Sequence, residues 1–134
     1  MGQRDRHPDC NGTSARVSIF TCIGIGVVAL IHVYILVLEM FLWTKPAGLR
    51  AFGQTLAAAN ASRVLAANQG LYNGFLAAGL VWSLTLGADG SRVAVFFLSC
   101  VMVAGVYGAF TASRKILYVQ AVPAALAMAA VLFT

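Results

Sequence analysis

The sequence predicts an all-α integral membrane protein in which four transmembrane helices form one bundle. Of its 134 residues, 60% are hydrophobic and only 10% are charged, whereas a soluble domain carries about a quarter charged residues. The mean hydropathy is +0.85. Four stretches reach or approach the roughly 20 apolar residues that a crossing helix needs. They are continuously apolar rather than alternating, which excludes a transmembrane β-barrel.

The four apolar stretches give the expected helices in order, and these are about 17–43, 64–87, 93–112 and 116–133. The first stretch is too long for the core of a signal peptide and no small-residue cleavage site follows it, so we expect it to stay in the protein. Before it, residues 1–16 mix charged residues with Pro8 and Gly12, and they are expected to form a mobile tail. Residues 17–134 then form the transmembrane domain.

The basic residues lie almost all between or just outside the apolar stretches, where they anchor helix ends to lipid headgroups. No basic stripe with interleaved aromatic residues is present, so nucleic acid is not an expected partner. Lys and Arg number four on one side of the predicted bundle and five on the other. This balance barely favours an orientation with both termini outside. We expect a multi-pass protein of the bacterial inner (cytoplasmic) membrane, surrounded by membrane lipids.

Small residues recur at four-residue spacing on three of the predicted helices, a pattern typical of close helix packing in lipid. The rows are Ala66, Gly70, Gly74 and Ala78, then Ala104, Gly108 and Ala112, then Ala121, Ala125 and Ala129. We expect each row to form a seam with a neighbouring helix. In the last helix, Pro123 is expected to cause a kink or a looser turn near the start, because it lacks a backbone N–H.

Ionisable side chains at membrane depth are the first candidates for a functional site, because they are costly there and mark functional sites by default. His32 lies near the middle of the first helix. Glu39 follows seven residues later, so both point the same way about 10 Å apart. No other acidic residue falls inside a predicted crossing segment, and no Lys or Arg lies at the depth of Glu39. Such a carboxyl group is expected to be at least partly protonated near neutral pH, and able to donate and recover protons.

Six polar residues are expected to join this pair in a pocket at one membrane face, with His32 as the floor and Glu39 in the wall. The alternation of crossings places them in the same half of the bundle. The expected substrate-binding residues are Asn68, Gln69, Tyr72, Asn73, Tyr107 and Gln120. The competing interpretation is that amides and tyrosines only join helices, through bonds worth about 0.6 to 2 kcal/mol each. For Glu39 we favour the functional interpretation.

No metal site and no cofactor are expected. One His and one Glu fall short of a usual ligand set. The cysteines, Cys10, Cys22 and Cys100, lack the spacing of metal ligands and are expected to be structural thiols.

Several blocks of this sequence carry a resemblance to a known family. They are His32–Tyr34, Glu39–Trp43, Ala67–Gly79, Val103–Gly108 and Gln120–Ala124. Through them the chain, from about Val17 to its end, resembles the small bacterial four-helix membrane proteins catalogued as domain of unknown function 1304. The resemblance implies the four-helix fold and supplies no established activity. Family members often have an acidic residue just before the histidine, where this chain has Ile31, so the expected proton carrier is Glu39 rather than a His–acid pair.

Three functions fit these features. The favoured one is an intramembrane acid–base enzyme acting on a lipid-soluble small molecule, by protonation-driven cyclisation or isomerisation of an isoprenoid-like compound. The second is a small proton-coupled multidrug-type transporter, which would have to be a dimer because four helices hardly enclose a path. The third is an accessory subunit of a membrane complex. Whether the chain forms a homo-oligomer stays open.

Overall fold

The computed structural model describes residues 19–133, so the predicted tail at 1–16 lies outside the described residues. Within that range the protein is all-α, as predicted, and contains no strand. Its elements are α1 (Ile19–Met40), α2 (Pro46–Phe52), α3 (Leu56–Thr85), α4 (Gly90–Thr111) and α5 (Val122–Phe133). A 3₁₀ turn at Gly87–Asp89 precedes α4, and a π-helical turn at Leu117–Ala121 precedes α5.

Two of these helices are long and apolar enough to cross a membrane. They are α1 and α4, with 22 residues each, which corresponds to about 33 Å of helix. Leu117–Phe133, which combines the π-helical turn with α5, is a shorter apolar helix. The longest helix is α3, with 30 residues. It is not one of the two apolar spans, because the amides in its first half lower its hydropathy.

The segment between α1 and α3 is more helical than the hydropathy pattern predicted. The helix that was predicted to begin near Val64 is α3, and it begins at Leu56. Its start is fixed by Thr55, whose hydroxyl accepts a hydrogen bond from the Ala58 backbone N–H at 3.2 Å. Residues 56–63 are rich in alanine, a strong helix former, so they extend the helix. Asn60, Ser62 and Arg63 interrupt the apolar pattern there, so hydropathy does not show this extension. The short helix α2 precedes it.

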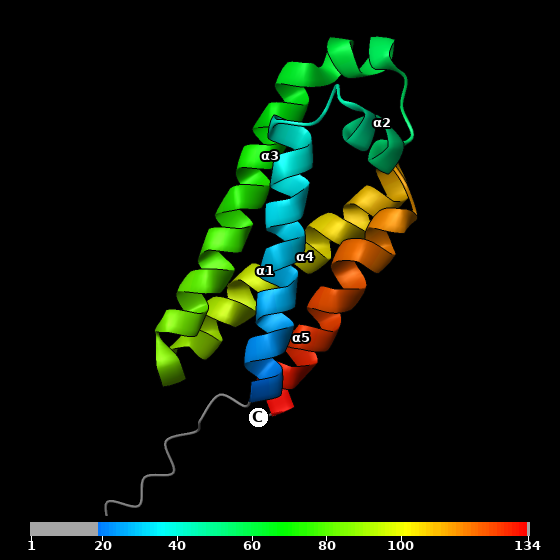
Figure 1. The fold of residues 1–134 in the computed structure, drawn as a ribbon. Coiled ribbons are helices and arrows are strands. Elements are labelled where there is room, and N and C mark those ends of the chain that lie inside the picture. Colours follow the sequence, from blue (N-terminus) through cyan, green and yellow to red (C-terminus); the bar gives the residue numbers. More distant parts are fainter. Residues whose placement is uncertain (1–18, 134) are drawn as a thin grey trace, which may run out of the picture.

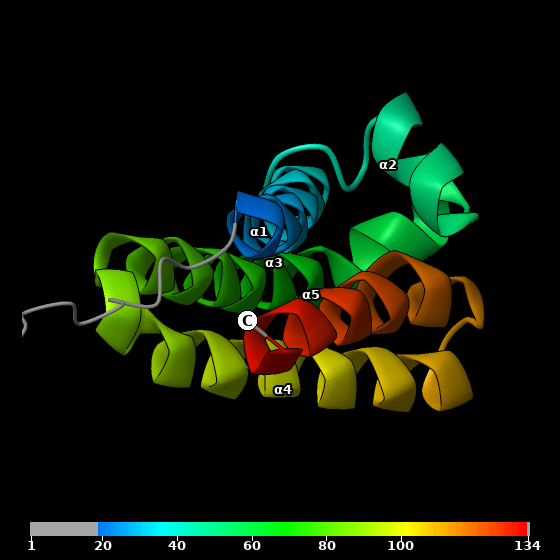
Figure 2. The ribbon, with the colours of Figure 1, turned by 90° about the horizontal axis from the view of Figure 1, so that it is seen from below.

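The helices run alternately up and down, and they are arranged as a four-cornered bundle (Figures 1 and 2). Seen from below, α1 and α4 lie on opposite sides, with α3 and α5 between them (Figure 2). Each of α1 and α4 therefore packs against both α3 and α5. The buried core lies at the end where all four helices converge. It comprises Ile25, Val28, Ala29, Leu80, Ala94, Leu98, Val101, Ala124 and Ala127.

At the other end the bundle separates into two pairs, α1 with α3 and α4 with α5 (Figure 1). We call this the open end; it contains the C-terminal ends of α1 and α4 and the start of α3. The opposite, closed end is held by close contacts. A Cβ atom at Gly79 of α3 would overlap the far edge of the Phe97 ring of α4. The hydroxyl of Thr21 in α1 donates a hydrogen bond to the Ala130 carbonyl of α5 at 3.2 Å.

The small-residue seams follow the prediction in part. On α3, Ala66 and Gly70 are buried and Gly74 lies against Leu36 of α1, as expected. Ala78 is exposed, and the next residue, Gly79, makes the close contact with α4 instead.

On the last two helices the predicted rows hold only in part: Ala121 is buried against Gly105, as expected. Ala104 and Ala125 are exposed, whereas Gly105 and Ala124 are buried. The physical reason is that helix contacts follow three- and four-residue steps in alternation, so a strict four-residue row drifts out of the interface.

Candidate functional site

Glu39 lies in the last turn of α1 and is joined to α3 by a hydrogen bond. Its Oε2 accepts from the Asn73 side-chain amide at 2.8 Å, and the same amide nitrogen donates to the Gln69 carbonyl at 3.1 Å. Gly70 makes this approach possible, because a Cβ there would lie 3.1 Å from the Glu39 Cβ and 2.6 Å from Met40. The carboxyl group is half-buried. Within the described residues its partner is an amide and not a cation.

His32 lies two turns deeper on the same face of α1 and is only 1% exposed. Its Nδ1 is 2.8 Å from the Val28 carbonyl oxygen. A carbonyl can only accept, so Nδ1 carries the proton and the Nε2 of the neutral ring is a bare acceptor. In the described part of the chain this buried Nε2 has no hydrogen-bond partner. The histidine therefore offers one unused lone pair inside the bundle.

The other predicted substrate-binding residues lie in the open half but do not contact Glu39 directly. Asn68 and Gln69 are exposed, Tyr72 and Tyr107 are 55% and 70% exposed, and Gln120 is half-buried. Of the six residues, only Asn73 is joined to Glu39 by a hydrogen bond of its side chain. Most of these side chains are thus exposed in the open half of the bundle and do not enclose Glu39.

Helix periodicity explains why Tyr72 and Gln69 are exposed. Tyr72 precedes Gly79 by seven residues, so the two side chains are only about 20° apart around α3. Gly79 packs against Phe97 of α4 near the closed end. Tyr72 is on the same face two turns nearer the open end, where α4 has already moved away (Figure 1). Tyr72 is therefore not covered by α4.

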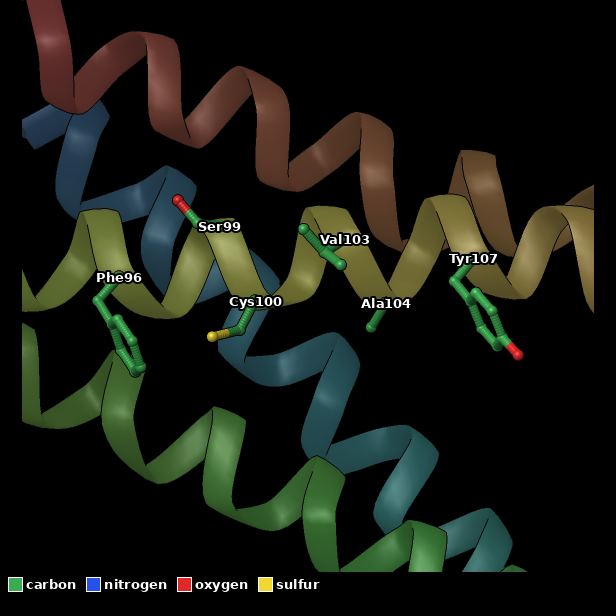
Figure 3. Close-up of a pocket in the computed structure, with 6 residues that line it drawn as sticks. All are labelled: Phe96, Ser99, Cys100, Val103, Ala104 and Tyr107. Atoms are coloured by element: carbon green, nitrogen blue, oxygen red, sulfur yellow. The ribbon is translucent and has the colours of Figure 1, made fainter.

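A shallow apolar groove lies on the surface of α4. It has a volume of about 560 Å³ and is lined by Phe96, Ser99, Cys100, Val103, Ala104 and Tyr107. Helix periodicity places these residues opposite the buried face of α4, which is formed by Ala94, Leu98, Val101 and Gly105. The groove is therefore on the outward surface of the helix, and in Figure 3 the side chains of Phe96, Cys100, Ala104 and Tyr107 point away from α5. Sequence reasoning identified Tyr107 alone, and the three- and four-residue spacing along this exposed face finds the others.

This arrangement can support proton transfer next to an apolar surface. The amide of Asn73 holds one carboxyl oxygen of Glu39, which leaves the other oxygen available to a bound molecule. No group of three or more His, Cys, Asp or Glu that could hold a metal ion occurs within residues 19–133.

Comparisons with known proteins place these residues in a defined sequence family. Residues 26–132 match the sequence model of a family described as "Protein of unknown function (DUF1304)". The chain is 29% identical over 114 residues to the "Uncharacterized protein YpaA" of Lactococcus lactis subsp. lactis (strain IL1403). That alignment covers 84% of this chain and 96% of the relative. No solved structure matches the chain.

Proposed function

Because the chain belongs to this DUF1304 family, whose description names no activity, we propose a function from its own residues: an intramembrane acid–base enzyme. It protonates a lipid-soluble substrate and catalyses the isomerisation or cyclisation of an isoprenoid-like molecule. Glu39 is the proton donor and His32 a second proton acceptor. The observation that carries the proposal is the carboxyl group of Glu39, buried between helices and bonded to Asn73 without a cation.

The surface of the molecule supports a membrane location with four spans. Large apolar side chains are exposed along all four long helices, including Phe20 at 76%, Val64 at 85%, Phe110 at 88% and Phe133 at 90%. An apolar surface of this extent is unfavourable in water and is the normal outer surface of a bundle in lipid. We therefore propose that α3 and α5, with the helical turn before α5, cross the bacterial inner membrane together with α1 and α4.

The proposed reaction needs no co-reactant. The free carboxyl oxygen of neutral Glu39 gives its proton to one carbon of a substrate double bond, and the adjacent carbon becomes cationic. In a cyclisation the cation then closes a ring, and in an isomerisation it does not. The Glu39 carboxylate, held by the Asn73 amide, takes a proton from a neighbouring carbon and is neutral again. The product is an isomer of the substrate, so atoms and electrons balance.

The remaining polar residues have positioning roles in this proposal. Gln69 and Tyr72 on α3, together with Tyr107 on α4, orient the polar part of the substrate. Gln120 and Asn68 contribute from the edges of the open half. Water is scarce in such a site, which protects a carbocation from hydration.

The test compares Glu39→Gln with Asp89→Asn in membranes of an expressing host. Asp89 is an exposed acid in the turn before α4, so its amide variant is the matched control. Extracted lipids are analysed by chromatography and mass spectrometry for isomer pairs whose ratio depends on the protein. Glu39→Gln should reduce this conversion by about 10²- to 10⁴-fold, and Asp89→Asn should leave it unchanged. Equal conversion by wild type and Glu39→Gln would refute the proposal.

The exposed amides of Asn68 and Gln69 favour the accessory-subunit alternative over the transporter, because polar groups on a lipid-facing helix are suited to bond to a partner helix. Co-purification of a stoichiometric partner from native membranes supports that alternative. Acidification or alkalisation of proteoliposomes on addition of a cationic drug supports the transporter.

A further inference from the structure

One packing face runs along α3, and only its part near the closed end is covered by another helix. Residues that recur at alternating steps of four and three lie on one face of a helix. At Gly79 this face packs against Phe97 of α4, and at Ser83 it is buried. Toward the open end the same spacing reaches five residues that are all exposed: Ala61, Leu65, Asn68, Tyr72 and Phe75. We call these five residues the α3 seam.

The α3 seam holds a polar amide within an apolar surface. Asn68 lies between Leu65, which is 65% exposed, and Phe75, which is 55% exposed. The indole N–H of Trp43 donates to the Ser62 hydroxyl at 3.2 Å, and tryptophan is typical of the membrane interface. Asn68 follows Ser62 by six residues of continuous helix, so it lies about 9 Å deeper. In the bilayer proposed above, its side chain therefore faces hydrocarbon.

The amide of Asn68 needs a hydrogen-bond partner that hydrocarbon cannot supply. Among residues 19–133 its side chain has no such partner. A primary amide both donates and accepts, so two Asn68 side chains can satisfy each other. A two-fold axis along the membrane normal brings each residue to its equivalent at the same depth. We infer that the protein forms a parallel homodimer through the α3 seam, in which the two Asn68 amides bond to each other.

The spacing of the seam fits a second α3 helix. Alternating steps of four and three are the contact pattern of two helices that cross at about 20°, the commonest packing of transmembrane helices. A single Asn in an apolar seam fixes the register of the two helices. The rings of Tyr72 and Phe75 contact each other edge to face, with their centroids 6.0 Å apart, and form the apolar part of the interface below Asn68.

The dimer leaves the Glu39 site within each chain. Gln69 is only about 40° from Asn73 around α3, so it stays on the side of the Glu39–Asn73 bond. Asn68 and Tyr72 point to the second copy, which covers the side on which they are exposed and closes the site toward lipid. The inference rests on the proposed membrane location and is independent of the acid–base reaction.

Cross-linking of the full chain in membranes locates the interface. The three native cysteines are first replaced by serine, and one cysteine is then introduced on a helix surface. Leu65→Cys should give a covalent homodimer on mild oxidation. The matched control is Leu126→Cys on α5, because Leu126 is 69% exposed and Leu65 is 65% exposed, and it should stay monomeric. Equal cross-linking at the two positions would overturn the inference.

The strength of the dimer tests the role of the amide. Energy transfer between donor- and acceptor-labelled copies of the full chain in mild detergent gives the dissociation constant. Asn68→Leu should weaken the dimer by about 5- to 30-fold, since a hydrogen bond between transmembrane helices contributes roughly that factor. Asn60→Leu is the matched control, because Asn60 is an exposed amide of α3 outside the seam, and it should have no effect. Equal effects of the two variants would contradict the inference.

Failure of this inference is distinguishable from failure of the proposed enzyme function. Glu39→Gln should dimerise like the wild type, because its partner Asn73 belongs to the same chain. A dimer without Glu39-dependent lipid conversion keeps the interface and removes the acid–base chemistry. A purified wild type that is monomeric at every concentration overturns the homodimer, and so does a Leu65→Cys chain that cross-links only to a different protein in native membranes.

Discussion

The contact between Gly79 and Phe97 predicts that Gly79→Ala destabilises the protein when the Phe97 ring is present and stabilises it when the ring is removed. A Cβ atom on Gly79 would overlap ring atoms of Phe97, whereas an ordinary contact of a Cβ with another heavy atom requires 3.4 Å or more. Gly79→Ala therefore has to displace the ring or the helix by roughly 1 Å, and overpacking of this kind costs about 1–3 kcal/mol. Alanine also favours the helix over glycine by about 1 kcal/mol. The net effect should be destabilisation by up to about 2 kcal/mol.

In the Phe97→Ala background the ring is absent and only the helix preference remains. Gly79→Ala should then stabilise the protein by up to about 1 kcal/mol. The free energy of unfolding is measured by titration with sodium dodecyl sulfate in mixed micelles, followed by circular dichroism. Gly26→Ala is the matched control, since a Cβ there meets nothing within 4 Å, and it should be neutral or stabilising in both backgrounds. An equal cost of Gly79→Ala with and without the Phe97 ring would refute this reasoning.

Three further outcomes are expected. A double-mutant cycle of Glu39→Ala and Asn73→Ala should give a coupling of about 0.6–1.7 kcal/mol in the free energy of unfolding; additive effects would contradict the 2.8 Å bond. Trp43→Phe should cost about 0.5–1.5 kcal/mol in the same assay, because the indole N–H loses the Ser62 hydroxyl at 3.2 Å, and a neutral result would show that this bond does not form. His32→Leu should change stability by less than about 1.5 kcal/mol and reduce the Glu39-dependent lipid conversion; unchanged conversion would remove the histidine from the site.

Hydropathy predicted the helices that consist of one continuous apolar stretch. It missed helical segments that depend on helix propensity and capping. The helix predicted at 93–112 is close to the observed Gly90–Thr111, because apolarity and helix length coincide there. The helical start of α3 and the whole of α2 lie in a segment of low hydropathy. There the helices depend on alanine content, on the Thr55 cap and on Pro46 at the first turn. A π-helical turn at Leu117–Ala121 stands where Pro123 predicted a looser start of the last helix.

The candidate site was predictable in its place along the helices and only partly in its contacts. Spacing along α1 placed His32 and Glu39 on one face, and the small residue Gly70 was expected in a seam. The bond between Glu39 and Asn73 requires that seam to join α1 and α3, and the sequence gives no pairing of helices. The divergence of α4 from α3 was equally hidden, because it depends on helix tilt. For that reason Tyr72 and Tyr107 were expected to line one shared pocket with Glu39, and both side chains are exposed instead.

The tight convergence of the four helices at one end limits how protons can reach the buried acid. Leu80 and Leu98 are both fully buried at the closed end, so a packed apolar core separates Glu39 from that side. Glu39 lies at the other, open end, and its carboxyl group exchanges its proton with the aqueous compartment there. Because the proposed cycle returns the proton to Glu39, that compartment sets only the resting protonation of the acid, and the conversion should respond to its acidity.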